Sequence, residues 1–193
     1  MTDASDEAPG DGATGAQYAA NEATLAGDAD PAAVREFHRQ FATGVTVVTA
    51  MDGERPRGLA VNAFASVSLE PPVIMVCVAR QSETAPALHE SAHLAVNMLA
   101  ADQVAIARRF AISGGDKFAE LEWRPGTNSA PILAGAAGHL EGRIERRVPA
   151  YTHTIFIVRV EAAETHPRSP MVYVRGEFHD AATLATPGGG GAR

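Results

Sequence analysis

The sequence predicts a single domain that is mostly β-sheet with short helices, built as an antiparallel barrel with helices plugging its ends. Hydrophobic residues make up 46% of the 193 residues, which is enough to bury one core. The β-rich runs are numerous and the helical patterns few, so the alternation typical of a parallel βαβ sheet is missing. An antiparallel barrel suits such a series of strands.

The first predicted elements are a helix and a strand. The helix is expected to begin at Asp30 and Pro31, an N-cap residue followed by a proline that suits the first turn, and to end at Gly44. Its apolar stripe consists of Val34, Phe37 and Phe41. The β-branched run over 45–51 predicts a strand, and Asp52-Gly53 predicts the hairpin turn that follows it.

The later elements are predicted from apolar and β-branched runs that lie between turn signals. Strands are expected over 57–69, 73–79, 94–99, about 136–147, 153–163 and 170–178. Helical segments are expected over 83–91, over 102–110 with Asp102 as its cap, and as a single turn over 116–121. The chain therefore reads as a series of strands with short helices between some of them.

The stretch GLAVNAFASVSLEPP, residues 58–72, has an unusual second face. Read as one strand, it places apolar residues from Leu59 to Leu69 at every other position, as a core-facing side requires. The opposite side carries Asn62, Phe64, Ser66 and Ser68 instead of charged residues. Two interpretations stand: these short polar groups line a ligand, or they form a serine-rich edge strand that faces water.

The net charge of −7 comes from one end of the chain. The first 30 residues hold seven acids and no Lys or Arg, so 16 of the 23 acids remain in residues 31–193 to balance the 16 bases there. We predict a disordered acidic arm over 1–30, a folded domain over 31–182 and a flexible glycine-rich tail over 183–193. Because the folded part is neutral, no nucleic-acid partner is expected.

Compartment and redox state follow from what the composition lacks. No stretch is apolar over the length of a membrane span, and the acidic start is not typical of a signal peptide. The single cysteine, Cys77, excludes an internal disulfide and gives no support to a cysteine-based metal site. It lies in the run VIMVCVA, where a buried thiol is the expected state. We therefore expect a cytoplasmic protein with no membrane partner.

Four motifs resemble one known family. They are FHRQFATGVTVVTA at 37–50, GLAVNAFASVSLEPP at 58–72, FAISGGDKFAEL at 110–121 and SAPILAGAAGHLEGRI at 129–144. Through these motifs most of the folded chain is similar to the flavin reductase family, which consists of short-chain FMN-binding split-barrel proteins. The resemblance implies an FMN-binding split β-barrel, an antiparallel barrel of Greek-key-like topology.

The resemblance also implies an activity. It points to an NAD(P)H-dependent flavin reductase, an oxidoreductase in which a hydride passes from the nicotinamide to flavin N5. The implied cofactor is FMN, with FAD as a second candidate, and NADH or NADPH is the co-substrate. Family members bind flavin at a subunit interface and supply reduced flavin to a monooxygenase, so a homodimer and such a partner are expected. The alternative is an FMN-binding barrel without nicotinamide-dependent reduction.

The resemblance assigns the flavin site to residues spread along the chain. The ring is expected along residues 62–67, with residues 56–60 opposite its edge. The set implied for cofactor binding is Pro56, Arg57, Gly58, Leu59, Ala60, Asn62, Ala63, Ser66, Val67, Cys77, Val78, Ala79, Ser82, Glu83, Thr84, Arg109, Phe110 and Lys117. Ala63 and Ala65 stand where the family usually has Ser and Thr, so backbone groups would carry more of the binding there.

Ser82 and Thr84 lie where a helix is predicted to begin, and two roles suit them. Hydroxyl and free N–H groups at a helix start bind phosphate, and the resemblance places the FMN phosphate here with help from Arg109, Phe110 and Lys117. Alternatively, Ser82 only caps the helix. The Gly-x-x-x-x-Gly-Lys pattern of a P-loop is absent from the sequence.

The segment Tyr151-Thr152-His153 departs from the family pattern, which is usually Gly-Asp-His. The resemblance places this loop on the nicotinamide side of the flavin and makes His153 the candidate catalytic residue. Tyr151 is bulkier than Gly, and Thr152 lacks a carboxylate that could orient His153. The sequence leaves open a second interpretation, in which the loop is a turn and His153 only bonds a neighbour.

The pentapeptide HESAH at 89–93 matches the zinc-protease pattern His-Glu-x-x-His. That chemistry needs both histidines on one helix face and a third ligand. The residues from Leu94 onward read as a strand, so His93 is expected beyond the end of the helix. No metal site is therefore predicted, and a zinc hydrolase remains only the third functional hypothesis.

Overall fold

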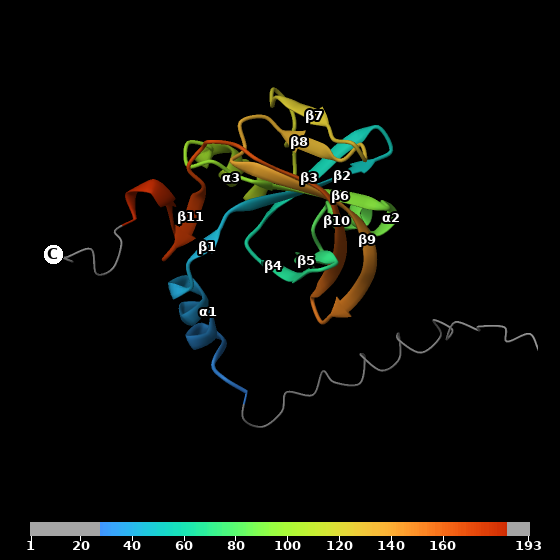
Figure 1. Ribbon diagram of the computed structural model, residues 1–193. Helices are drawn as coiled ribbons and strands as arrows, with labels where there is room; N and C mark the ends of the chain where they lie inside the picture. The colour runs from blue at the N-terminus through green and yellow to red at the C-terminus, as the bar shows by residue number, and fades with distance from the viewer. Residues whose placement is uncertain (1–27, 185–193) are drawn as a thin grey trace, which may run out of the picture. The chain divides into compact units, whose positions relative to one another are not determined.

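The computed structural model describes residues 28–184 (Figure 1). The predicted arm over 1–30 and the predicted tail over 183–193 lie almost entirely outside the described residues. The chain divides into two compact units, Met1–Glu36 and Phe37–Arg193, and every described strand belongs to the second. All predicted site residues lie in the second unit.

Helix α1 (Pro31–Gln40) begins where the sequence predicted it. The Asp30 carboxylate accepts a hydrogen bond from the Ala32 amide at 3.0 Å, as an N-cap residue does. The predicted apolar stripe is not buried, since Phe37 and Phe41 are 71% and 65% exposed. The predicted start is confirmed, whereas the helix ends at Gln40 and not at the predicted Gly44.

Seven strands form one antiparallel sheet in the order β3-β2-β6-β9-β10-β5-β4 (Figure 1). Their bounds are β2 (Thr46–Asp52), β3 (Arg55–Val61), β4 (Phe64–Leu69), β5 (Pro72–Ala79), β6 (His93–Met98), β9 (Gly138–Ala150) and β10 (His153–Thr165). Strands β2 and β3 form the hairpin predicted at Asp52 and Gly53. Strands β9 and β10 form a longer hairpin, with two register shifts that interrupt its ladder.

One face of this sheet encloses the main core. Val61 of β3 and Val76 of β5 belong to the same buried cluster, although their strands lie at or next to opposite ends of the strand order. The sheet must therefore curl around these side chains, which makes it an antiparallel barrel split between β3 and β4. Helix α2 (Ala85–Glu90) plugs the interior with Ala85 and Leu88, as the sequence analysis predicted.

The single strand predicted over 57–69 is wrong. The chain divides this stretch into β3 and β4, which form the two opposite edges of the sheet. The Phe64 amide donates to the Asn62 carbonyl at 3.0 Å, so the backbone turns between the two strands. A register shift between Ser66 and Ser68 then interrupts the alternation along β4. Local alternation cannot reveal the break, because β3 pairs with β2 whereas β4 pairs with β5.

A second cluster covers the outer face of the barrel. Val47 of β2 packs there with Leu99 and with Phe110 of helix α3 (Val104–Ala111), whereas the adjacent Val48 points into the barrel. The other outer elements are β1 (Thr43–Gly44), β7 (Trp123–Pro125), β8 (Pro131–Leu133), β11 (Met171–Val174), β12 (Glu177–Asp180) and the 3₁₀ helix η2 (Ala181–Thr183). Strands β1, β11 and β12 form a three-stranded sheet, and β7 pairs with β8.

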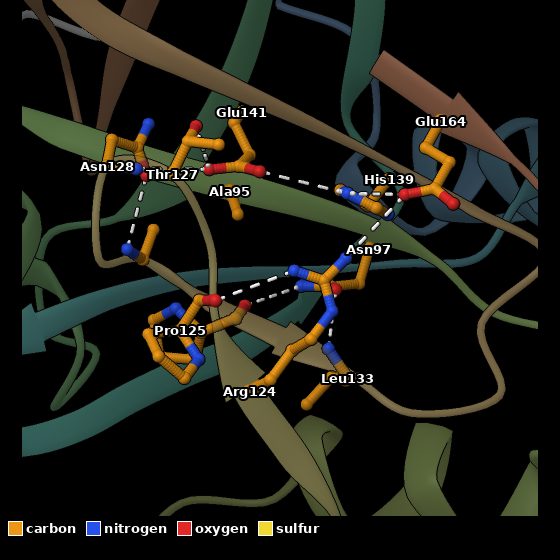
Figure 2. A network of polar contacts seen from close by, with 12 residues as sticks. Ala95, Asn97, Arg124, Pro125, Thr127, Asn128, Leu133, His139, Glu141 and Glu164 are labelled. Carbon is orange, nitrogen blue, oxygen red and sulfur yellow. Dashed lines mark hydrogen bonds and ion pairs between the residues drawn. The ribbon is translucent and has the colours of Figure 1, made fainter. Parts of the chain in front are cut away.

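The hairpin β7–β8 was not predicted, and one buried side chain explains why it forms. Asn97 of β6 donates to the Pro131 carbonyl at 3.2 Å and accepts from the Leu133 amide at 2.8 Å (Figure 2). Its side chain is fully buried, so these bonds join β8 to the barrel in the absence of water. The partner of this short strand is therefore a side chain from another strand, which no local pattern shows.

Two further predictions were wrong. The strand predicted over 170–178 is the hairpin β11–β12, because Arg175 and Gly176 both adopt positive φ and reverse the chain. Asp102 does not cap α3, whose N-cap residue is Gln103. The Asp102 carboxylate instead accepts from the Arg168 guanidinium at 2.5 Å. In each case a tertiary or turn interaction replaced the role that the local sequence suggested.

Candidate functional site

A hollow lies between strand β3, the start of helix α2 and the loop that follows α3. Its lining consists of Pro56, Arg57, Gly58, Glu83, Thr84, Gly115, Lys117 and Phe118. The sequence analysis had assigned all of these residues to the cofactor except Gly115 and Phe118. The sequence did carry a signal for Gly115, namely the two consecutive glycines 114 and 115 in SGGD. In the structure both adopt positive φ, which glycine tolerates best.

Gly58 forms the wall of this hollow because no side chain fits there. A Cβ atom at Gly58 would lie 2.8 Å from Cε1 of Phe110 and 3.2 Å from Cγ2 of Thr49. The Phe110 ring is 1% exposed and stacks edge-on against Phe118, with 5.2 Å between the ring centroids. Phe110, predicted to bind the cofactor, therefore supports the wall from behind and does not line the hollow with its ring.

The polar groups of the hollow converge on one carbonyl. The Thr84 hydroxyl donates to the Gly58 carbonyl at 2.9 Å, and Nζ of Lys117 lies 3.4 Å from the same oxygen. Burial lowers the pKa of Lys117, and the nearby Glu83 carboxylate partly opposes that shift. The hollow thus holds a partly desolvated ammonium group whose hydrogen bonds to protein carbonyls are long.

The Ser82 hydroxyl answers one question that the sequence left open. Its oxygen is buried and has no hydrogen-bond partner among the described residues. The N-cap residue of α2 is Thr84, and that residue makes no side-chain capping bond. Capping of the helix by Ser82 is therefore wrong. A buried hydroxyl without a partner is costly, so it marks a place where a ligand or water supplies the missing bond.

A second group of predicted residues lies across neighbouring strands. The Cys77 amide of β5 donates to the Ala63 carbonyl at 3.0 Å, just before β4 begins. Two residues further along β5, Ala79 pairs with His153 at the start of β10. Burial raises the pKa of Cys77, which keeps its thiol protonated and unreactive. This row therefore offers backbone groups and short side chains, with no nucleophile.

The β9–β10 turn brings Tyr151 and His153 to the end of that row. The Arg80 amide, which follows β5, donates to the Thr152 carbonyl at 3.0 Å and holds the turn in place. Tyr151 adopts φ = 51°, a left-handed conformation that favours glycine, and its ring is 71% exposed. The Thr152 hydroxyl lies 2.9 Å from Nδ1 of His153, which is exposed.

A second, apolar hollow of about 200 Å³ lies between β3, α3 and the sheet of β11 and β12. It is lined by Val45, Ala60, Val61, Asn62, Ala107, Ala111, Tyr173 and Phe178. Ala60 and Asn62 were predicted as site residues, whereas Tyr173 and Phe178 were missed. These aromatic side chains come from β11 and β12, which the sequence analysis had merged into one strand, so their shared face could not be recognised.

The structure does not bring every predicted residue together. Leu59 packs against the barrel core, and the buried Val78 belongs to it, so neither side chain is free for a ligand. Arg109 donates to the Ala119 carbonyl at 2.9 Å and lines a separate hollow with Gly114 and Asp116, which shares Gly115 and Lys117 with the first. Ser66 and Val67 are exposed on β4 at the sheet edge.

The histidines of HESAH do not share a helix face. Helix α2 ends at Glu90, and His93 lies in β6, as the sequence analysis expected. Nε2 of His89 lies 3.3 Å from the Thr154 hydroxyl, whereas Nε2 of His93 lies 3.6 Å from the Glu161 carboxylate. The two rings thus have different neighbours. Between residues 28 and 184, no helix has both the length and the apolar composition that crossing a bilayer requires.

The fold and the two hollows define a flavin reductase-like split barrel. The family model described as "Flavin reductase like domain" matches residues 37–182, which is most of the chain and nearly all of its second unit. The chain therefore belongs to this family. The family resemblance inferred from the four sequence motifs is confirmed, as is the fold.

Curated relatives have names that agree with this family. A Streptomyces globisporus protein named "NADH-dependent FAD reductase" is 38% identical over 86% of this chain and 94% of its own length. The reductase subunit of a flavin-dependent monooxygenase from Rhodococcus jostii is 32% identical over 89% of this chain and 84% of its own. A Rhizobium meliloti protein named "Probable flavin reductase" is 37% identical over 77% of this chain. The chain spans only 48% of that relative.

Solved structures show the same fold. The NADH:FAD oxidoreductase of Streptomyces globisporus, in complex with NAD and FAD fragments, has a TM-score of 0.75 and 37% identity. The matched region covers 85% of this chain and 99% of that one. A second structure, a flavin reductase in its native state, has a TM-score of 0.73, 26% identity and coverage of 82% and 100%. The barrel described above is thus an oxidoreductase fold with known flavin-reducing members.

Proposed function

We propose that this chain is an NAD(P)H-dependent flavin reductase that binds FMN or FAD and supplies reduced flavin to a partner monooxygenase. The observation that carries the proposal is the hollow at Gly58, where predicted flavin-binding residues from three separate segments line one space. The flavin, when bound, supplies the redox chemistry, since it accepts a hydride and passes two electrons on. The names of the Streptomyces and Rhodococcus relatives support the co-substrate and the partner.

The polar groups of the hollow fit a phosphorylated ligand. Lys117, which lines the hollow, supplies a positive charge. Ser82 directly precedes the lining residues Glu83 and Thr84, and its buried hydroxyl has no hydrogen-bond partner among the described residues. Gly58 lets the wall pack directly against the Phe110 ring, since a Cβ atom there would collide with it. We assign the flavin phosphate to Lys117 and Ser82. Thr84 holds the Gly58 carbonyl, so its hydroxyl hydrogen is already used.

The ring of the flavin is assigned to the segment between β3 and β4 and to the facing strands. Asn62 lines the apolar hollow with Tyr173 and Phe178, which offer flat surfaces of the kind that ring systems pack against. Ala63 uses its carbonyl to accept from Cys77, so the backbone around it is held in position. The short side chains here leave room beside the ring.

His153 is assigned to the nicotinamide side as the candidate catalytic residue. Its Nδ1 atom lies beside the Thr152 hydroxyl, while its other ring nitrogen has no hydrogen bond within residues 28–184. That free nitrogen is available to bond the co-substrate and hold it for transfer. The pairing of His153 with Ala79 places it at the end of the row that contains Cys77.

A homodimer belongs to the same proposal. Strand β4 exposes Val67 and Leu69, and a strongly apolar hollow of about 360 Å³ that includes Phe64, Met98 and Ala163 adjoins its start. A second copy of the chain would cover these apolar side chains. Light scattering at micromolar concentration should report twice the mass of one chain, and a stable monomer would contradict the dimer.

The single cysteine fits the proposed cytoplasmic location.

Flavin binding and NADH oxidation together test the function. The purified chain should quench FMN fluorescence on titration and should oxidise NADH only when FMN or FAD is added. NADPH is measured in parallel, because nothing in the site selects between the two. Failure to bind either flavin would refute the proposal.

An alternative is a flavin-binding barrel that does not oxidise nicotinamide. The observation that favours it is the β9–β10 turn, where Tyr151 and Thr152 replace the glycine and the carboxylate expected from the resemblance. Flavin binding without NADH or NADPH oxidation, in the wild type and also in a variant with the Gly-Asp-His turn restored, would establish this alternative.

A further inference from the structure

Three possible metal ligands meet outside the candidate flavin site. They are His139 on β9, Glu164 near the end of β10 and His166 just beyond it, and their ligand atoms all lie within 4.8 Å of one another. Nε2 of His139 lies 3.7 Å from Oε2 of Glu164, and Nδ1 of His166 lies 3.8 Å from Oε1 of Glu164. Ligands around a tetrahedral zinc ion are about 3.4 Å apart, so small side-chain movements would bring these atoms to bonding positions.

His139 is buried without a hydrogen bond. Its side chain is 3% exposed, and its Nδ1 atom has no partner within residues 28–184. In that range its Nε2 atom has two carboxylate neighbours, both beyond hydrogen-bond distance. These are Glu164 and, at 3.8 Å, Oε1 of Glu141 (Figure 2). Buried polar groups normally have a hydrogen-bond partner. A buried imidazole that faces two carboxylates without bonding either therefore lacks the partner that a purely structural role would give it.

The charges around His139 also favour a cation. Glu141 is as buried as His139. Within residues 28–184, the other oxygen of its carboxylate accepts only from two neutral donors, the Thr127 hydroxyl at 2.9 Å and the Asn128 amide at 3.3 Å. Among the described residues, Arg124 is the one guanidinium or ammonium group paired with Glu164, at 3.6 Å. With both imidazoles neutral, two carboxylates therefore face a single guanidinium group.

We propose that His139, Glu164 and His166 bind a divalent transition-metal ion of the zinc class. Two imidazole nitrogens and one carboxylate form a ligand set that suits zinc and not calcium or magnesium, which prefer oxygen ligands. Glu141 lies next to the site and can hold His139 in position or complete the coordination. Arg124 would move from Glu164 when the metal binds.

The site would join β9 to the segment after β10. Backbone bonds already hold that segment close, since the His166 amide donates to the Ala137 carbonyl at 2.9 Å, immediately before β9. Its ligands are absent from the lining of the hollow at Gly58, so the metal has a structural role and is not a source of hydride chemistry. The sequence analysis considered only HESAH as a metal motif and predicted no site there. The proposed ligands come from β9, the end of β10 and the residue after it, so they show no helical spacing.

The test uses the full chain after treatment with a chelator. Zn²⁺ is titrated against a chromophoric competitor, and Co²⁺ is used as a spectroscopic probe of coordination. We expect one Zn²⁺ ion per chain with a submicromolar dissociation constant. The visible spectrum of bound Co²⁺ should be that of a four- or five-coordinate complex with nitrogen ligands. Mg²⁺ in large excess should not compete. His166→Ala should weaken Zn²⁺ binding by at least about tenfold, the lower end of what even outer-shell groups contribute.

Matched controls come from the other histidines. His93→Ala removes a half-buried histidine that has one carboxylate neighbour and no third ligand, and His89→Ala removes the other histidine of HESAH. Neither should change the affinity. Because His166 is exposed, its variant should fold, and circular dichroism checks this. No binding below about 10 μM, unchanged affinity in His166→Ala, or an equal loss in either control overturns the proposal.

Discussion

The hollow at Gly58 and the turn at Tyr151 differ in what determines their residues. In the hollow, Gly58 is required because Phe110 from a distant helix occupies the space where a side chain would lie. In the turn, Tyr151 is exposed and takes a left-handed conformation that a glycine would adopt at less cost. Tertiary packing thus constrains the first region, whereas the second tolerates a departure from the family pattern. We expect the hollow to control stability and flavin binding, and the turn to control the nicotinamide.

The largest expected effect comes from the packing behind the hollow. Phe110→Ala removes a buried ring that supports Gly58 and should lower the free energy of unfolding by about 3–5 kcal/mol. Chemical denaturation measures this loss. Tyr151→Ala removes an aromatic ring from the exposed turn and should change stability by less than about 0.5 kcal/mol. Equal losses in the two variants would show that the contrast between the regions is wrong.

The next effect concerns the charge in the hollow. Lys117→Met should weaken FMN binding by about 1.5–3 kcal/mol, because a charge-assisted bond to the phosphate is lost. Riboflavin has the same ring without the phosphate, so its affinity should hardly change. Fluorescence titration with both ligands makes the comparison, and Lys117→Arg is the charge-retaining control. A similar loss for riboflavin would place Lys117 beside the ring instead.

The turn should control the nicotinamide and not the flavin. We expect a high apparent KM for NADH, because Thr152 supplies no carboxylate to bond the ribose of the nicotinamide. We also expect little preference for NADH over NADPH, because no carboxylate repels the extra phosphate of NADPH. Tyr151→Gly combined with Thr152→Asp should lower the KM for NADH roughly tenfold, which is about 1.4 kcal/mol, and leave FMN affinity unchanged. Steady-state kinetics give the KM. A wild type that is already saturated at low NADH concentration would contradict this role.

A smaller effect separates two neighbouring hydroxyls. Ser82→Ala should weaken FMN by about 1 kcal/mol without loss of stability, since the Ser82 hydroxyl has no partner in the described residues. Thr84→Ala should lower stability by about 1 kcal/mol instead, because its buried bond to the Gly58 carbonyl is lost. Thermal melts and FMN titrations of both variants decide between these roles. If the two variants behave alike, the hydroxyls share one function.

The smallest effect is a dependence of FMN affinity on pH. Burial lowers the pKa of Lys117, so in the free protein this group begins to lose its charge below the ordinary value of 10.5. A bound phosphate raises that pKa again, so binding takes up a proton in this range and affinity falls as pH increases through the lowered pKa. FMN dissociation constants between about pH 7 and pH 10 measure it. Riboflavin corrects for titration of the ring, and Lys117→Arg should abolish the decline.

Local signals predicted much of the secondary structure because their causes are local. The Asp30 cap, the hairpin at Asp52 and Gly53, and the short helix α2 all appear as expected. Such features depend on backbone conformation and on side chains a few residues away. The strand predicted over 57–69 failed for the opposite reason. Its two halves show one continuous alternation, but each pairs with a different distant strand.

The candidate site was predicted in its parts but not in its arrangement. The resemblance supplied Gly58, Thr84 and Lys117 as separate positions, and the structure shows that they surround one hollow. Tyr173 and Phe178 were missed because they meet only after β11 and β12 fold into a hairpin. Phe110 was assigned to the ligand, although its ring is buried behind the wall.

The sequence by itself determined the family, the antiparallel strands and most of the residues that surround the hollow. The strands follow from hydrophobic periodicity and turn residues, which are properties of neighbouring positions. The family and the residues around the hollow follow from the resemblance of four motifs to the flavin reductase family. Only the tertiary structure decided which hydroxyl stays unpartnered, which residue supports Gly58 and which histidines meet a carboxylate. The bond of Thr84 to Gly58 and the cluster of His139, Glu164 and His166 join distant segments. Such contacts exist only after the sheet has curled, because pairing between strands sets which side chains share a face.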